Sequence, residues 1–105
     1  MTQFSANGEV GFRFLDVDFD VKSDIQYSID ASSNTVDATL PISGEVGLLV
    51  TVHNESTSTN LVQLLNTSLT INGPNGTISA GTDVELVPGD TFQFVFKTLT
   101  TLEAI

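Results

Sequence analysis

The chain has 105 residues, no cysteine and a formal net charge of −10. This length predicts one domain with a single core, and the absence of cysteine excludes disulfides and thiolate metal sites. Thirteen acidic residues stand against three basic ones, so the chain cannot build the positive face that a nucleic-acid partner requires, and an anionic membrane is disfavoured for the same reason.

The first 24 residues are expected to form an N-terminal arm or added strands, ahead of a β-sandwich domain over residues 25–105. Residues 1–8 are interpreted as a lead-in. Residues 9–22 hold two alternating apolar runs in opposite phase, on even and then on odd positions: Val10, Phe12 and Phe14, followed by Leu15, Val17, Phe19 and Val21. Because side chains alternate between faces of a strand, the change of phase requires a bulge, a turn or a change of partner strand.

Phe12 and Phe14 are the candidate interface residues of this segment, because their phase is inconsistent with one buried face. Two interpretations are open. The pair lies in a contact with another subunit or docking partner, or it lies in the core of its own domain.

From residue 25 the chain alternates in short runs separated by turn residues, which is typical of strands. An exposed loop is expected over 54–60. The segment 48–52 is expected to be buried on both faces, with Val46 and Leu49 on the second face. Pro41 should end the strand that precedes this segment, since proline has no N–H to donate. The first three of these strands are expected around Ile25–Ile29, Val36–Leu40 and Leu48–Val52.

Residues 61–65 fit either a helical stripe or a strand, and the strand is favoured because the stretch is short. A strand at 69–71 leads into Asn72-Gly73-Pro74-Asn75-Gly76, the strongest turn signal of the chain. A second turn, Pro88-Gly89-Asp90, separates Val84 and Leu86 from a run of phenylalanines at 92, 94 and 96. The form of the tail from residue 98 is left open.

These spacings predict an all-β, single-domain protein: an antiparallel β-sandwich or a jelly-roll-like barrel of about eight short strands. Only 15% of the residues are charged, and the mean hydropathy is slightly positive. A small domain of this composition leaves apolar surface uncovered, which favours a protein that associates with itself or with a partner.

Asp16, Asp18 and Asp20 imitate the opening of a calcium loop. An EF-hand loop needs glycine at its sixth position and glutamate at its twelfth, and Val21 and Tyr27 stand there. The three aspartates are therefore interpreted as a charged strand face that discourages edge pairing. A calcium site or an intersubunit site is the alternative.

No other motif predicts chemistry, so no catalytic, metal-binding or cofactor-binding residue is assigned, and an enzyme is not expected. His53 is the only histidine and lacks a partner pattern for catalysis. The Gly73–Gly76 segment is interpreted as a turn rather than a phosphate loop. The alternating phenylalanines from Phe92 are assigned to the core, with a sugar-stacking platform as the alternative. Three glycosylation sequons are interpreted as accidents of composition: Asn54, Asn66 and Asn75.

The order of several elements resembles a small β module of virion proteins in tailed bacteriophages, found in fibres, spikes and head-surface proteins. The matching segments run through about two thirds of the chain: Ile29-Asp30, Leu40-Pro41, Gly47 to Asn54, Val62, Ile71 to Gly73, and Phe92 to Phe96. A tryptophan common near the closing strand of that module is replaced by phenylalanine here. The resemblance implies a virion component that is trimeric and non-enzymatic.

With that resemblance, the expected function is a capsid decoration or cement protein that binds the outside of a phage head as a homotrimer. Its partners would be other copies of itself and the major capsid protein or another virion protein, with no nucleic acid and no membrane. It would be made in the host cytoplasm and end on the particle surface. A tail, collar or fibre domain that recognises a host receptor is the alternative, and a carbohydrate-binding module is a further one.

Overall fold

The computed structural model describes residues 11–105, so the expected lead-in over 1–8 and Val10 lie outside the described residues. That part of the chain contains strands and no helix, which confirms the all-β prediction. Its eleven strands, more than the eight expected, are β1 (Gly11–Leu15), β2 (Phe19–Asp20), β3 (Ile25–Ile29), β4 (Val36–Thr39), β5 (Leu49–Asn54), β6 (Val62–Leu65), β7 (Thr70–Gly73), β8 (Gly76–Ile78), β9 (Val84–Leu86), β10 (Thr91–Thr98) and β11 (Thr101–Ala104).

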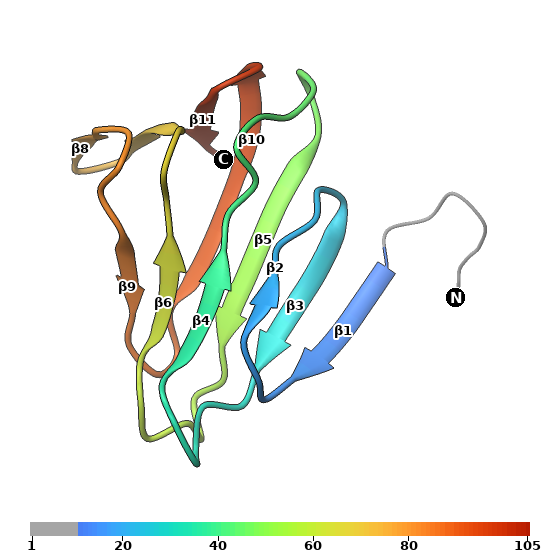
Figure 1. The fold of residues 1–105 in the computed structure, drawn as a ribbon, viewed down its shortest axis with the longest axis vertical. Coiled ribbons are helices and arrows are strands. Elements are labelled where there is room, and N and C mark those ends of the chain that lie inside the picture. Colours follow the sequence, from blue (N-terminus) through green and yellow to red (C-terminus); the bar gives the residue numbers. More distant parts are fainter. Residues whose placement is uncertain (1–10) are drawn as a thin grey trace.

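The strands form two sheets that face each other as a sandwich (Figure 1). The large sheet has the order β1-β3-β5-β10-β11-β7-β8, and the small sheet has the order β2-β4-β6-β9. Both sheets are mixed, so the prediction of an antiparallel sandwich is wrong in this respect. The parallel pairs are β1–β3, β3–β5, β2–β4, β4–β6 and β7–β11.

The parallel pairs arise from the way in which the chain winds. Strands β1, β3 and β5 lie in the large sheet, and β2, β4 and β6 lie in the small sheet. From β1 to β6 the chain therefore crosses to the opposite sheet after every strand. Each strand runs parallel to the previous strand of its own sheet, so that the chain winds as a coil in which each turn contains two strands. Strands β9 and β10 then close this coil by pairing antiparallel with β6 and β5.

This winding also explains the change of phase over residues 9–22. Strand β1 belongs to the large sheet and β2 to the small sheet, so the segment does change its partner strand. Leu15, Phe19 and Val21 pack against or within the core on the inner side. Phe12 and Phe14 point the other way and are exposed.

The core lies between the two sheets and follows the period of two along each strand. Strand β5 shows this, because Val50 and Val52 are fully buried whereas Leu49 on the other face is only half-buried. The expected burial of this segment on both faces is therefore wrong, and Val46 is exposed in the preceding loop. The physical reason is that no further layer within residues 11–105 covers the outer face of the large sheet.

Several local predictions are confirmed. Residues 62–65 form strand β6 rather than a helix. Pro74 and Asn75 form the turn of the β7–β8 hairpin, and Gly89 has the positive φ, 94°, that the turn before β10 requires. The tail, whose form the sequence left open, forms β11 and pairs antiparallel with β10.

Two buried asparagines hold the loops against the strand ends. The side-chain amide of Asn54 donates hydrogen bonds to the carbonyls of Leu86 (2.9 Å) and Asn60 (3.1 Å). The amide of Asn66 donates to the carbonyls of Leu69 (2.8 Å) and Thr82 (3.2 Å), and its oxygen accepts from the Leu69 N–H (3.0 Å). These bonds satisfy backbone groups that would otherwise be buried without partners.

Gly44 allows the loop between β4 and β5 to close over the core. A Cβ at this position would lie 2.3 Å from the ring of Phe96, which is one of the largest buried side chains. The Gly44 N–H donates to the carbonyl of Leu99 in the turn between β10 and β11. Glycine is therefore required here by close approach rather than by backbone conformation.

Candidate interaction surfaces

Phe12 and Phe14 stand on the outer side of β1, the edge strand of the large sheet. Their side chains are 52% and 74% exposed, and their ring centroids lie 4.9 Å apart. The pair therefore lies outside the core of its own domain. Burial of two such rings by a partner would supply a large apolar contribution to binding.

Among the strands at sheet edges within residues 11–105, β1 is the longest. It has five residues, whereas the other edge strands, β2, β8 and β9, have two, three and three. Very short edge strands are one way in which proteins prevent unwanted pairing. Of the four edges, β1 thus offers the most unpaired backbone within residues 11–105.

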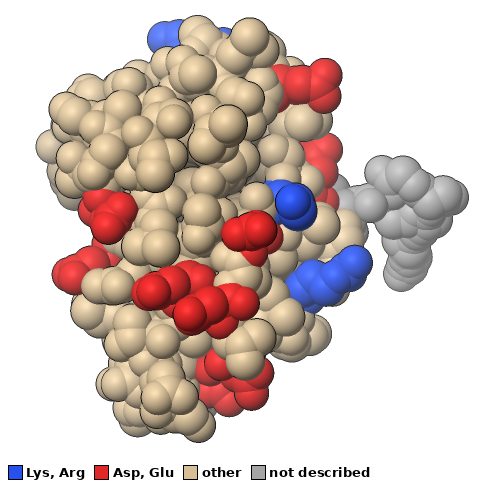
Figure 2. Space-filling model, viewed as in Figure 1, with Lys and Arg blue, Asp and Glu red and all other residues tan. Residues whose placement is uncertain are grey.

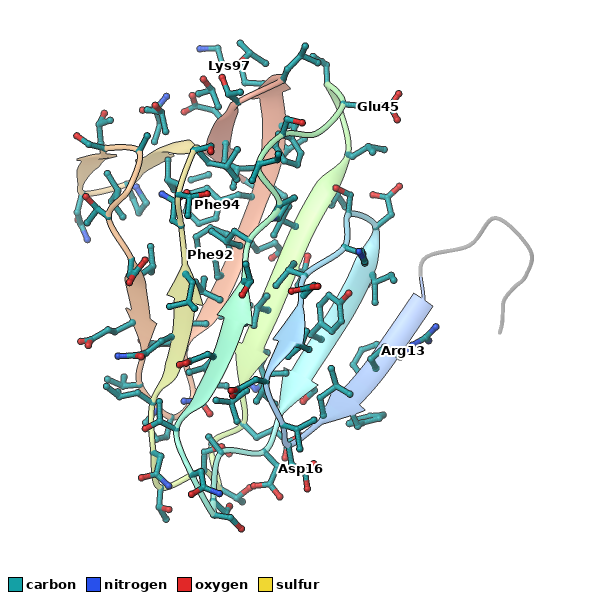
Figure 3. All side chains as sticks on the ribbon, viewed as in Figure 1. Arg13, Asp16, Glu45, Phe92, Phe94 and Lys97 are labelled. Carbon is teal, nitrogen blue, oxygen red and sulfur yellow. The ribbon has the colours of Figure 1, made fainter. Side chains whose placement is uncertain are left out.

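Two of the three candidate calcium ligands lie in the bend between β1 and β2, and the third lies in β2 itself. Asp16, Asp18 and Asp20 are all exposed, and a carboxylate oxygen of Asp18 accepts a hydrogen bond from the Asp37 N–H at 2.9 Å. Within residues 11–105 no three side chains of the metal-binding types come close enough together to hold an ion. Figure 3 labels Asp16 at this bend, beside the end of β1. The carboxylates add negative charge next to the short β2 edge.

The other candidates from the sequence take structural positions. The Nδ1 atom of His53 lies 2.8 Å from the Thr91 hydroxyl, a cross-strand pair between β5 and β10. Phe92 and Phe96 are buried in the core. Phe94 is only half-buried, because it lines a pocket.

This pocket lies between the two sheets at the flank that carries β8 and β9. It has a volume of about 320 Å³ and is lined by Phe92 and Phe94 of β10, Ile78 of β8, and Val84 and Leu86 of β9, among other residues. The two phenylalanine rings are 4.1 Å apart between centroids, and Figure 3 shows them on β10 between the two sheets. The lining is largely apolar. A cavity of roughly 150 Å³ is enough to bind benzene, so this pocket has room for an aromatic side chain.

The sequence contains no direct signal for the pocket, because the three strands that build it, β8, β9 and β10, are consecutive in the chain but belong to two different sheets. The alternation of Val84 and Leu86 indicated an inward face. It could not indicate that this face lies at the open flank of the sandwich, where the last inward side chains are incompletely covered.

Acidic side chains are not confined to one flank of the molecule. Two of the three cationic side chains in the chain, Arg13 and Lys22, belong to β1 and to the loop between β2 and β3, and four aspartates lie in the same stretch: Asp16, Asp18, Asp20 and Asp24. Figure 2 shows acidic side chains across the visible face, beside the basic ones as well as on the opposite flank. Along β9 and directly before it, Asp83 and Glu85 alternate with the pocket-lining Val84 and Leu86.

The sequons at Asn54 and Asn66 lie at buried side chains that are 0% and 2% exposed and whose amides are engaged in hydrogen bonds. A glycan at either position is incompatible with this fold. Asn75 is exposed in the β7–β8 turn.

No protein-family model matches the chain, and a search of curated proteins finds no match. Within residues 11–105 there is no helix of the length and apolar character needed to cross a membrane.

Proposed function

We propose that this chain is a non-enzymatic structural protein of a phage virion, and that it decorates the outside of the head as a homotrimer. The observation that carries the proposal is the exposed pair Phe12 and Phe14 on the open edge strand β1. A domain with this surface is suited to binding other proteins.

The order of elements that resembles the phage β module supports the same proposal. Leu40 and Pro41 directly follow β4, the run from Gly47 to Asn54 contains β5, and Phe92 to Phe96 lie in β10. The elements on which the resemblance depends therefore coincide with strands of a β-sandwich. On a head, the partner would be the major capsid protein or another virion protein, and the site of action would be the particle surface.

The experiment is to purify particles of the phage that encodes the chain, identify their proteins by mass spectrometry, and image particles that carry a tagged copy. Density or label on the head surface is the expected result. Label on the tail, collar or fibres would replace decoration by the tail function. Absence of the protein from purified particles would overturn the virion proposal altogether.

A further inference from the structure

The β7–β8 hairpin contains two asparagines that are each followed by glycine: Asn72-Gly73 at the end of β7, and Asn75-Gly76 at the turn into β8. The side-chain carbonyl of an asparagine can react with the backbone nitrogen of the next residue. Glycine hinders this reaction least, because it has no Cβ. The sequence alone therefore predicts the same reactivity for both asparagines, and the fold must decide between them.

The fold holds the side chain of Asn72 in place. Its amide nitrogen donates a hydrogen bond to Oε1 of Glu103 on β11 at 3.0 Å. Its amide oxygen accepts a hydrogen bond from the hydroxyl of Thr77 on β8, also at 3.0 Å. Both partners stand opposite Asn72 in the register of the neighbouring strands. Both hydrogen bonds must break before the side chain of Asn72 can turn toward the nitrogen of Gly73.

Asn75 lies in a different environment, although it is only three positions further along the chain. It is exposed in the turn of the hairpin, and its side chain makes no hydrogen bond within residues 11–105. Gly76 is exposed as well and has a φ of 129°, a conformation that other residues rarely adopt. The turn therefore requires glycine at the position that makes Asn75 reactive. Figure 1 shows β8 at the margin of the molecule.

We infer that Asn75 is a site of spontaneous deamidation and that Asn72 is protected from the same reaction by the fold. The backbone nitrogen of Gly76 loses its proton and attacks Cγ of Asn75. The new C–N bond closes a five-membered succinimide, the bond from Cγ to Nδ2 breaks, and ammonia leaves with a proton from water. A water molecule then opens the ring at either carbonyl, which gives aspartate or isoaspartate.

The product changes the hairpin in charge and in geometry. Either product adds a carboxylate, which is ionised at neutral pH, and isoaspartate also adds one carbon to the backbone of the turn. Strand β8 has three residues and pairs only with β7 in the described part of the chain. Since Asn75 and Gly76 line the pocket beside Phe92 and Phe94, the reaction places a charge at an apolar site.

The test follows both asparagines in one full-length chain. The folded protein is incubated at physiological temperature and mildly alkaline pH, and a second sample is incubated unfolded in guanidinium chloride. Cleavage after glutamate releases the peptide 56–85, which contains Asn72 and Asn75. Tandem mass spectrometry then assigns the mass gain of deamidation to one asparagine or the other.

In the folded protein, Asn75 should react at least about tenfold faster than Asn72, because two hydrogen bonds protect Asn72 and one of them has a charged acceptor. In the unfolded sample the two should react at comparable rates, since glycine follows both. The unfolded sample thus separates the effect of the fold from the effect of the sequence.

Three variants test the two halves of the inference. Asn75→Ser keeps a residue that suits turns and should abolish the fast gain in the folded protein. Glu103→Ala removes the acceptor of the Asn72 amide and should accelerate the reaction at Asn72. Glu103→Gln is its matched control, because it keeps an acceptor oxygen and should protect Asn72 as the unmodified chain does. Circular dichroism verifies that each variant is folded.

Two results would overturn the inference. One is a folded protein in which Asn72 reacts as fast as Asn75. The other is a folded protein in which Asn75 stays intact over a period that converts both asparagines of the unfolded sample. Neither result depends on how the chain assembles or on where it acts.

Discussion

Replacing Asn66 by alanine should destabilise the fold strongly, although Asn66 lies in the loop between β6 and β7. The side chain is 2% exposed, and it accepts from the Leu69 N–H while donating to the carbonyls of Leu69 and Thr82. Alanine leaves these backbone groups without their partner, and each unsatisfied buried group costs roughly 1–3 kcal/mol. Because water entering the vacated space offsets part of the loss, the expected decrease in the free energy of unfolding is about 2–4 kcal/mol.

Urea unfolding at one fixed protein concentration measures this decrease, because association would otherwise shift the apparent stability. Thr67→Ala is the matched control: Thr67 is the exposed neighbour, and its hydroxyl contacts only the Ser68 hydroxyl. The control should change the free energy of unfolding by less than about 0.5 kcal/mol. If Asn66→Ala is as mild as the control, the asparagine does not hold the loop in the way described.

Three further substitutions or additions test the fold. Gly44→Ala should lower the free energy of unfolding by about 1–3 kcal/mol through overpacking, because the new Cβ would lie 2.3 Å from Phe96. The control in the same urea assay is Gly11→Ala, because a Cβ at Gly11 would lie 3.6 Å from its nearest atoms. Phe96→Ala should cost about 3–5 kcal/mol, and a loss no greater than that of exposed Leu99→Ala would contradict its place in the core. Millimolar calcium should leave the melting temperature unchanged, because no group of ligands assembles within residues 11–105; a rise of several degrees would refute this.

The sequence predicted the strands and turns well where one local rule decided them. Pro41 and the Pro74–Asn75 turn follow from the backbone restrictions of their residue types, and Val50 and Val52 follow from the period of two. The neighbour of each strand in its sheet was harder to predict from the sequence. A period of two gives the inward face of a strand but does not reveal whether its neighbour runs parallel, so the coiled path of β1 to β6 was missed.

The surfaces were predicted only in part. The opposite phase of Phe12 and Phe14 indicated that they do not share the face of Leu15, and the structure places both rings outside the core. The pocket depends on the placement of β8, β9 and β10 in two sheets that face each other, which no local pattern encodes. The exposed loop predicted over 54–60 begins at Asn54, whose side chain is in fact buried, because a polar side chain in a Ser- and Thr-rich stretch gives no sign that its amide is buried. The burial of Asn66 had no signal in the sequence for the same reason.

The most direct test of the central claim, that this domain assembles as a homotrimer, is sedimentation equilibrium of the unmodified chain over a wide range of concentration. The account predicts a mass close to three times the 11.2 kDa of one chain, approached as the concentration rises. A mass of 11.2 kDa at every concentration would contradict it.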